Sequence, residues 1–217
     1  MTPVLYIGNK NYSSWSLRSW LLLSEAGIDF EERRIPLDRP ETRERIREVS
    51  AAGCVPVLVL GDETIWDTLA IAETVAERWP DRSLWPQDAA ARAHARSVSA
   101  EMHSGFAPLR DALPMNCRAT GRKVALSDAV TRDIERIIAI WTDCQRRYAS
   151  GDWLFGDFGV ADAMFAPVVL RFRTYGIDLP SRASRYPSRL LESEALQQWL
   201  LDAEAETEVI EADEKGL

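Results

Sequence analysis

The spacing of hydrophobic and polar positions changes near residue 80. Before it, short apolar runs of strand length alternate with segments of helical spacing, in the order strand, helix, strand, helix, strand, strand, helix. This order predicts a small sheet with helices packed against it. The predicted strands are residues 3–8, 29–37, 56–60 and 64–66, and the predicted helices are residues 17–26, 40–49 and 69–79.

A segment with two prolines and several turn residues, Pro80–Asp88, interrupts this pattern, and we place a domain boundary there. Beyond it the spacing is helical almost throughout. The sequence therefore predicts an α+β domain over residues 1–80 followed by an all-α domain over residues 81–217. The predicted helices are a long one through residues 95–109 that ends near Pro114, and others at 130–148, 160–175 and 190–201.

Charge excludes one class of function and is unevenly distributed. The chain of 217 residues carries a formal net charge of −8, whereas nucleic-acid binding requires a basic surface. Residues 202–217 hold seven acids against one lysine, and we expect them to be a solvated end or a frayed last helix without a chemical role. Residues 81–201 are mildly basic, which is compatible with an anionic substrate.

Cysteine and histidine usage predicts no metal site. The three cysteines are widely separated, and the two histidines cannot complete a zinc site without distant carboxylates. We expect Cys54 to be a packed thiol. The first residues lack a signal-peptide pattern, and no apolar stretch approaches the ~20 residues of a membrane span. A reducing cytoplasm is the expected compartment, with no membrane partner.

The first segment with candidate catalytic residues is Ser13-Ser14-Trp15-Ser16, between the first strand and the first helix. A hydroxyl at a helix N-terminus can donate a hydrogen bond to a sulfur anion, and the exposed N–H groups add positive potential there. A thiol with an ordinary pKa near ~8.5 would shift towards the nucleophilic thiolate in such a place. The structural alternative is that Ser13 or Ser14 only caps the helix.

Three further short motifs each have a plain structural explanation as well. Val55-Pro56 opens a predicted strand, where a missing N–H donor is harmless. Asp67-Thr68 precedes a helix and is a common helix cap. Gly159, three residues before Asp162, has the spacing of a capping box for the helix at 160–175.

The order of elements and these motifs together resemble the glutathione transferase superfamily, over nearly the whole chain. The segment Asn11–Arg18 is similar to the serine-type, bacterial zeta-like branch. The resemblance implies a thioredoxin-like N-terminal domain and a helical C-terminal domain. It implies that glutathione is the co-substrate, that no cofactor is permanently bound, and that the chain forms a homodimer.

The resemblance also implies roles for particular residues. The functional hydroxyl of serine-type relatives lies five residues before the helix arginine, here Arg18, which indicates Ser13 as the catalytic residue, with Ser14 and Tyr12 as alternates. The backbone of Val55, before a cis-proline, would pair with the cysteinyl unit of glutathione. The glutathione-binding residues implied are Ser14, Trp15, Val55, Pro56, Asp67 and Thr68. Ser50-Ala51 and Cys54 depart from the pattern of many relatives.

The implied function is conjugation of glutathione to a small hydrophobic electrophile, a detoxification reaction. The electrophile pocket would be lined from the helical domain by Met102, His103, Phe106, Arg110 and Asn116. One alternative is a glutathione-dependent cis–trans isomerase of the maleylacetoacetate type, and another is a non-catalytic glutathione-binding module. A thiol-disulfide reductase is disfavoured, because the relevant position holds serine instead of cysteine.

Overall fold

The N-terminal part contains a four-stranded mixed sheet in the order β2-β1-β3-β4. The computed structural model describes residues 2–148 and 151–216. Strand β1 pairs in parallel with β2 and antiparallel with β3, and β3 pairs antiparallel with β4. The order of elements predicted for this part is confirmed. The elements are β1 (Val4–Ile7), α1 (Ser14–Glu25), β2 (Glu31–Arg34), α2 (Thr42–Arg47), β3 (Val57–Leu60), β4 (Glu63–Trp66) and α3 (Thr68–Arg78).

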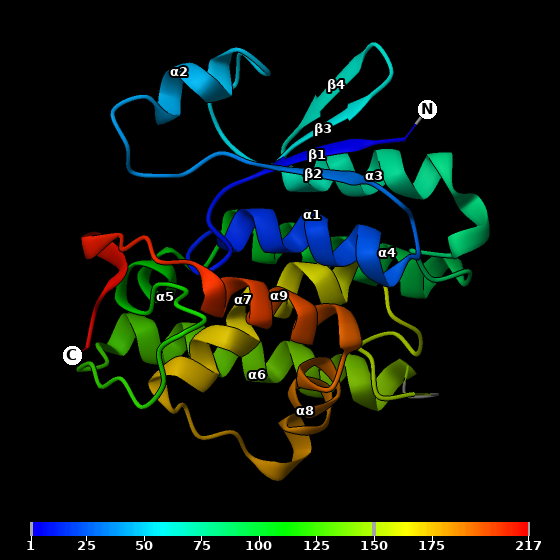
Figure 1. Ribbon diagram of the computed structural model, residues 1–217. Helices are drawn as coiled ribbons and strands as arrows, with labels where there is room; N and C mark the ends of the chain where they lie inside the picture. The colour runs from blue at the N-terminus through cyan, green and yellow to red at the C-terminus, as the bar shows by residue number, and fades with distance from the viewer. Residues whose placement is uncertain (1, 149–150, 217) are drawn as a thin grey trace.

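Helices α1 and α3 cover one side of this sheet, and α2 lies on the other side (Figure 1). The central strands bury Leu5, Ile7 and Leu58 completely against the helices. The edge strand β2 exposes all four of its charged residues, which protects an open sheet edge from pairing with another chain. A loop of residues 8–13 connects the central strand β1 to the N-terminus of α1.

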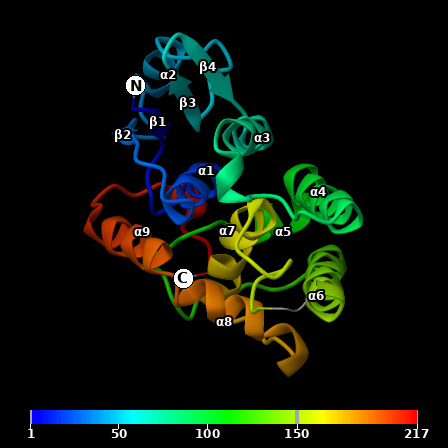
Figure 2. The same ribbon diagram turned by 90° about the vertical axis from the view of Figure 1, so that its right-hand side faces the viewer.

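The C-terminal part is helical and is built around α7 (Figure 2). Helix α7 packs against α1, α4 and α8, and nearly all its residues are buried, as its continuous apolar character predicts. The helices are α4 (Ala89–Ser104), α5 (Ala107–Ala112), α6 (Asp128–Tyr148), α7 (Val160–Tyr175), α8 (Arg185–Leu191) and α9 (Glu194–Ala205).

Two of the predicted helices are each interrupted, which corrects the prediction from periodicity. The long helix through residues 95–109 ends at Ser104, and α5 starts after Phe106, whose φ is +61°. The Arg110 side chain donates to the carbonyls of Met102 and Gly105, and so satisfies acceptors left free at the end of α4. The helix at 190–201 is also two helices, because Ser193 caps α9 by accepting from the Leu196 N–H at 3.1 Å.

Gly159 and Asp162 start α7 as the capping-box spacing predicts. The Asp162 carboxylate accepts from the Gly159 N–H at 2.9 Å and from the Leu154 N–H at 3.0 Å. A Cβ at residue 159 would lie 2.7 Å from the carbonyl oxygen of Leu84 in the linker. Glycine at this position is therefore explained by the close approach of the linker.

The acidic C-terminal segment is ordered and packed, so the expectation of a solvated or frayed end is wrong. After α9, residues 206–216 cross the loop that precedes α1 (Figure 1). Glu214 accepts from the Tyr12 hydroxyl and from Asn116 and Arg122, and Glu208 forms an ion pair with Arg34. Glu206, Glu208 and Glu214 of this segment thus make specific contacts with residues of the N-terminal part and of the connection between α5 and α6.

Candidate functional site

Ser13 is the N-cap of α1, and its side chain is largely buried. Its Oγ accepts from the Ser16 N–H at 3.3 Å and donates to the Ser16 Oγ at 2.7 Å. The Ser16 Oγ in turn accepts from the Gly8 N–H at 2.9 Å. The capping role is therefore real, and it fixes the Ser13 oxygen at the positive end of the helix.

The two alternate hydroxyls are held by other groups. The Ser14 Oγ accepts from Arg171 Nη2 at 3.2 Å, from the central helix α7. The Tyr12 hydroxyl donates to Glu214 at 2.7 Å and accepts from Arg118 Nη2 at 3.0 Å. Burial and the bond to Glu214 raise the pKa of Tyr12, which disfavours its ionised form. The Tyr12 hydroxyl is thus held by Glu214 of the C-terminal segment.

Three arginines from different helices gather around the first turn of α1. Arg18 lies with its guanidinium 4.2 Å from the centre of the Trp15 ring, and Arg110 lies 5.0 Å from the same ring. Arg171 donates to Ser14 and to backbone carbonyls of Arg110 and Leu113. Within the described residues, none of these three arginines forms an ion pair with a carboxylate. The first turn of α1 therefore lies beside three arginine side chains.

Arg18 is the most unusual member of this group. It is only 1% exposed, and its three guanidinium nitrogens have no hydrogen-bond partner among the described residues. Burial, followed by the charges of Arg110 and Arg171, lowers the pKa of Arg18 well below its ordinary value. A negative charge that develops near Ser13 or Ser14 is favoured by this cluster.

The peptide bond between Val55 and Pro56 is cis, as the resemblance implies. Val55 lies just before β3, whose ladder with β4 begins at Val57. Cys54 is exposed, so the expectation of a packed thiol is wrong. It lies at the edge of a hollow of about 460 Å³ between this loop and α2, where Arg39, Arg43 and Arg47 also lie.

Asp67 and Thr68 start α3 and make an unexpected contact with the helical part. One Asp67 oxygen accepts from the Leu69 N–H at 2.8 Å, and the other lies 3.1 Å from His103 Nε2. The Thr68 hydroxyl lies 3.4 Å from the Nδ1 of the same ring. His103 also makes an edge contact with Trp15, their ring centres 5.3 Å apart. His103 therefore links Asp67, Thr68 and Trp15, a connection that sequence spacing cannot reveal.

The residues predicted to line an electrophile pocket divide into two groups. His103 and Arg110 are half-buried and contact Trp15, near the first turn of α1. Met102 and Phe106 are in the hydrophobic core, and Asn116 is buried with its amide bound to Glu214. Met102 is 0% exposed. Lining by these residues stays a prediction, and His103 and Arg110 are the two best placed for it.

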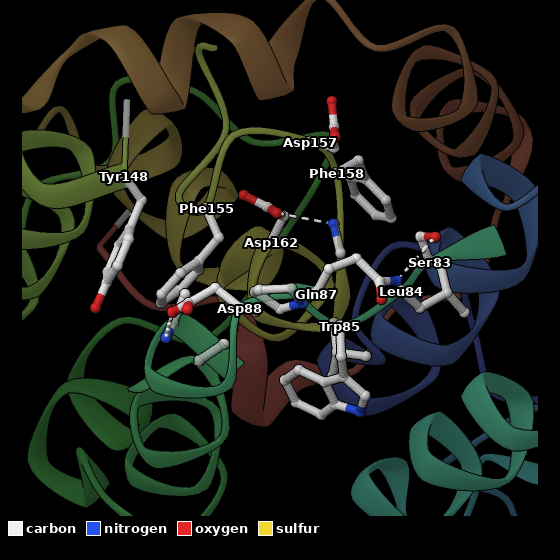
Figure 3. A pocket seen from close by; sticks show the side chains of 16 residues that line it. Ser83, Leu84, Trp85, Gln87, Asp88, Tyr148, Phe155, Asp157, Phe158 and Asp162 are labelled. Atoms are coloured by element: carbon white, nitrogen blue, oxygen red, sulfur yellow. Dashed lines mark hydrogen bonds between the residues drawn. The ribbon is translucent and has the colours of Figure 1, made fainter. Parts of the chain in front are cut away.

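A separate cavity of about 320 Å³ lies at the N-terminal ends of α4 and α7 (Figure 3). The linker contributes Leu84 and Trp85, and the segment before α7 contributes Phe155 and Phe158. Helix α4 has 16 residues and so is roughly 24 Å long. His103 lies near its opposite end, so this cavity is distinct from the site around Ser13.

Neither a membrane span nor a metal site is found in the described part of the chain. No helix of residues 2–148 and 151–216 has the length and hydropathy needed to cross a membrane. In the same residues, no group of three or more His, Cys, Asp or Glu side chains could hold a metal ion.

Comparison with known families identifies the class of protein to which this fold belongs. Residues 12–78 match the model of the glutathione S-transferase N-terminal domain, and residues 125–200 match that of the C-terminal domain. The chain belongs to the glutathione S-transferase superfamily, a family of enzymes, and resembles its zeta-like members.

Individual relatives are of two named kinds. The chain is 29% identical to a probable maleylacetoacetate isomerase of Caenorhabditis elegans, over 86% of this chain and 84% of the relative. It is 30% identical to glutathione S-transferase 1 of Dianthus caryophyllus, over 81% and 80% of the two chains. A crystal structure of a Burkholderia glutathione transferase homolog with bound glutathione superimposes with a TM-score of 0.71 at 26% identity, covering 94% of this chain and 98% of that one.

Proposed function

We propose that this enzyme stabilises the thiolate of glutathione with the Ser13 hydroxyl, which turns its proton from the Ser16 Oγ to the sulfur, and transfers the sulfur to a small electrophile. The observation that carries the proposal is the position of Ser13 at the N-terminus of α1, beside three arginines without carboxylate partners among the described residues. The thiolate sulfur forms a bond to the electrophilic carbon, and the leaving group departs with the electron pair of its bond. The thiol proton passes to solvent.

The remaining parts of glutathione have a matching set of polar groups in this proposal. The backbone of Val55 pairs with the cysteinyl unit, since the residue lies just before the strand ladder. Asp67 and Thr68 take the ammonium and carboxylate of the γ-glutamyl unit at the start of α3. Trp15 contacts His103 and Arg110 of the helical part. The half-buried His103 and Arg110 place the electrophile next to Trp15.

Isomerisation is the second candidate, because several relatives are named maleylacetoacetate isomerases. The same thiolate would add to a cis double bond of a small diacid, allow rotation, and leave again. Glutathione is then regenerated, whereas conjugation consumes it. Product formation with and without loss of free glutathione distinguishes the two reactions.

The test of the proposed function combines binding and turnover. Wild-type protein should be retained on immobilised glutathione and should conjugate a generic aryl halide. Ser13→Ala should keep the retention and lose about tenfold to hundredfold in turnover, the effect of one charge-assisted hydrogen bond of about 1.5–3 kcal/mol. Absence of both retention and turnover in the wild type would refute the proposal. Full turnover in Ser13→Ala would move the role to Ser14 or Tyr12.

The proposed enzyme has two domains and forms a dimer. We propose a glutathione-binding domain over residues 1–80 and a helical domain over residues 81–217, which act together as a cytoplasmic homodimer in detoxification. Light scattering of the purified protein tests the dimer, since a monomer at working concentration would contradict it.

A further inference from the structure

The loop that carries Ser13 is held from the C-terminal segment. The backbone N–H groups of Lys10 and Asn11 both donate to the Glu206 carboxylate, at 2.8 and 3.0 Å. The Glu206 side chain is only 8% exposed, so water competes weakly for these bonds. One carboxylate thus accepts from two successive backbone groups, three and two residues before Ser13.

The carbonyl groups of the same two residues are also satisfied from the helical part. Trp199 Nε1 donates to the Lys10 carbonyl at 3.0 Å, and the Cys117 N–H donates to the Asn11 carbonyl at 3.1 Å. Residues 10 and 11 therefore have their backbone polar groups bound to segments that lie more than a hundred residues away. Because buried backbone groups need partners, these segments determine the path of the loop.

The loop transmits this placement to Ser13 through Asn9. The Asn9 carbonyl accepts from the N–H of Tyr12 at 3.2 Å and from the N–H of Ser13 at 2.8 Å, which closes a turn around residues 10 and 11. A shift of the Lys10 and Asn11 backbone therefore moves the turn whose last residue is the N-cap of α1.

We propose that Glu206 is a positioning residue for catalysis, which fixes the Ser13 hydroxyl relative to the glutathione thiolate by binding the loop before it. This inference rests on the proposed function of Ser13. Glu206 does not touch the reacting atoms and acts through the Lys10 and Asn11 backbone.

A carboxylate is the group that this position requires. Glutamine would present one acceptor and one N–H₂ group to two N–H donors, so one donor loses its partner. Arg34 reinforces the arrangement from the outer side, where its Nη1 lies 3.2 Å from the same Glu206 carboxylate. Glu211, in the same acidic segment, is exposed and has no hydrogen bond or ion pair through its side chain among the described residues, which makes it a matched control.

The test compares full-length Glu206→Gln with Glu211→Gln, which make the same change in charge. Glutathione is added, and the pKa of its bound thiol is measured from the ultraviolet absorbance of the thiolate across a pH series. We expect Glu206→Gln to raise this pKa by about half a unit to one unit and to lower kcat/KM about threefold to tenfold below that pKa. The KM for glutathione should stay within about twofold, because the groups that hold the peptide are elsewhere. Glu211→Gln should match the wild type.

Hydrogen exchange of the Lys10 and Asn11 amides is measured in parallel and should accelerate in Glu206→Gln alone. Faster exchange with an unchanged thiol pKa would overturn the positioning role and leave Glu206 as a purely structural residue. Equal behaviour of the two variants would overturn the proposal entirely.

Two further controls keep the test decisive. If Glu206→Gln does not fold, Arg34→Gln at the exposed side of the same contact should give a smaller shift of the thiol pKa in the same direction, and an unchanged pKa would overturn the proposal. If wild-type protein does not bind glutathione, the proposed function itself fails. The exchange data then still report whether Glu206 holds the loop.

Discussion

Replacing Asp162 by asparagine should make the stability of the protein less dependent on pH. The carboxyl is 1% exposed and lines the cavity at the start of α7 (Figure 3). It accepts from the Leu154 and Gly159 N–H groups. Burial raises its pKa to about 7, against an ordinary value of 3.8. The native protein therefore binds a proton at pH 5 that the unfolded chain releases.

The sign and size of the effect follow from this difference. Because the pKa is higher in the folded protein, the stabilisation is fully present below the unfolded pKa and is lost as the pH rises through 7. Between pH 5 and pH 8 the folded protein releases the Asp162 proton, which the unfolded chain has already released at pH 5. The two pH units from pH 5 to the folded pKa of about 7 correspond to a loss of about 3 kcal/mol in the free energy of unfolding. The asparagine side chain of the variant does not titrate, and the other carboxyl groups cancel in the comparison of the two proteins.

The assay is urea unfolding of wild type and Asp162→Asn at pH 5 and pH 8. At pH 5 the wild type should be the more stable protein, since asparagine also leaves one buried N–H without an acceptor, at a cost of about 1–3 kcal/mol. At pH 8 the gap in the free energy of unfolding should shrink by about 3 kcal/mol or reverse. Asp157→Asn, an exposed neighbour, is the control. A gap that stays constant between the two pH values would show that the Asp162 carboxyl does not titrate between them.

Three further predictions concern other parts of the chain. A thiol-alkylating reagent should modify one cysteine of the native protein, Cys54, because burial raises the pKa of the other two thiols to about 12; modification of a second thiol without unfolding would contradict this. A chain that ends at Ala205 should lose about 2–4 kcal/mol of unfolding free energy in urea titrations, because the charge-assisted bonds from Glu206 and Glu214 to the loop before α1 disappear. An unchanged urea midpoint would contradict the packing of residues 206–216 against this loop. His103→Ala should raise the KM for glutathione about threefold to tenfold with a smaller change in kcat, because Asp67 loses its contact across the two parts. His94→Ala, in the first half of α4 and in contact with Tyr148, is the control, and equal KM values for both variants would contradict this role of His103.

Local patterns predicted most of the fold. Alternation of apolar runs and helical spacing in the first 80 residues indicated all seven elements, since each run is bounded by glycine, proline or a cap. The two errors in the helical part have a common cause. Apolar spacing continues through the breaks at Gly105 and Ser193, because the helices on either side pack on the same core. Periodicity reports the buried face and not the continuity of the backbone.

The candidate site was predicted less completely, for a physical reason. Ser13 and Asp67 could be found because their roles as caps depend on neighbours in the sequence. The contact of His103 with Asp67, and that of Glu206 with Lys10 and Asn11, depend on packing between distant segments. A run of acidic residues is usually solvated, and only tertiary structure shows that this one is bound.

The proposed role of the Ser13 hydroxyl is to stabilise the glutathione thiolate at the N-terminus of α1. The most direct measurement is the pKa of the thiol of bound glutathione, from thiolate absorbance, in wild type and in Ser13→Ala. We expect a pKa well below the ordinary value of ~8.5 in the wild type and a return of at least about one unit towards it in the variant. An identical pKa in both proteins would contradict this role of Ser13.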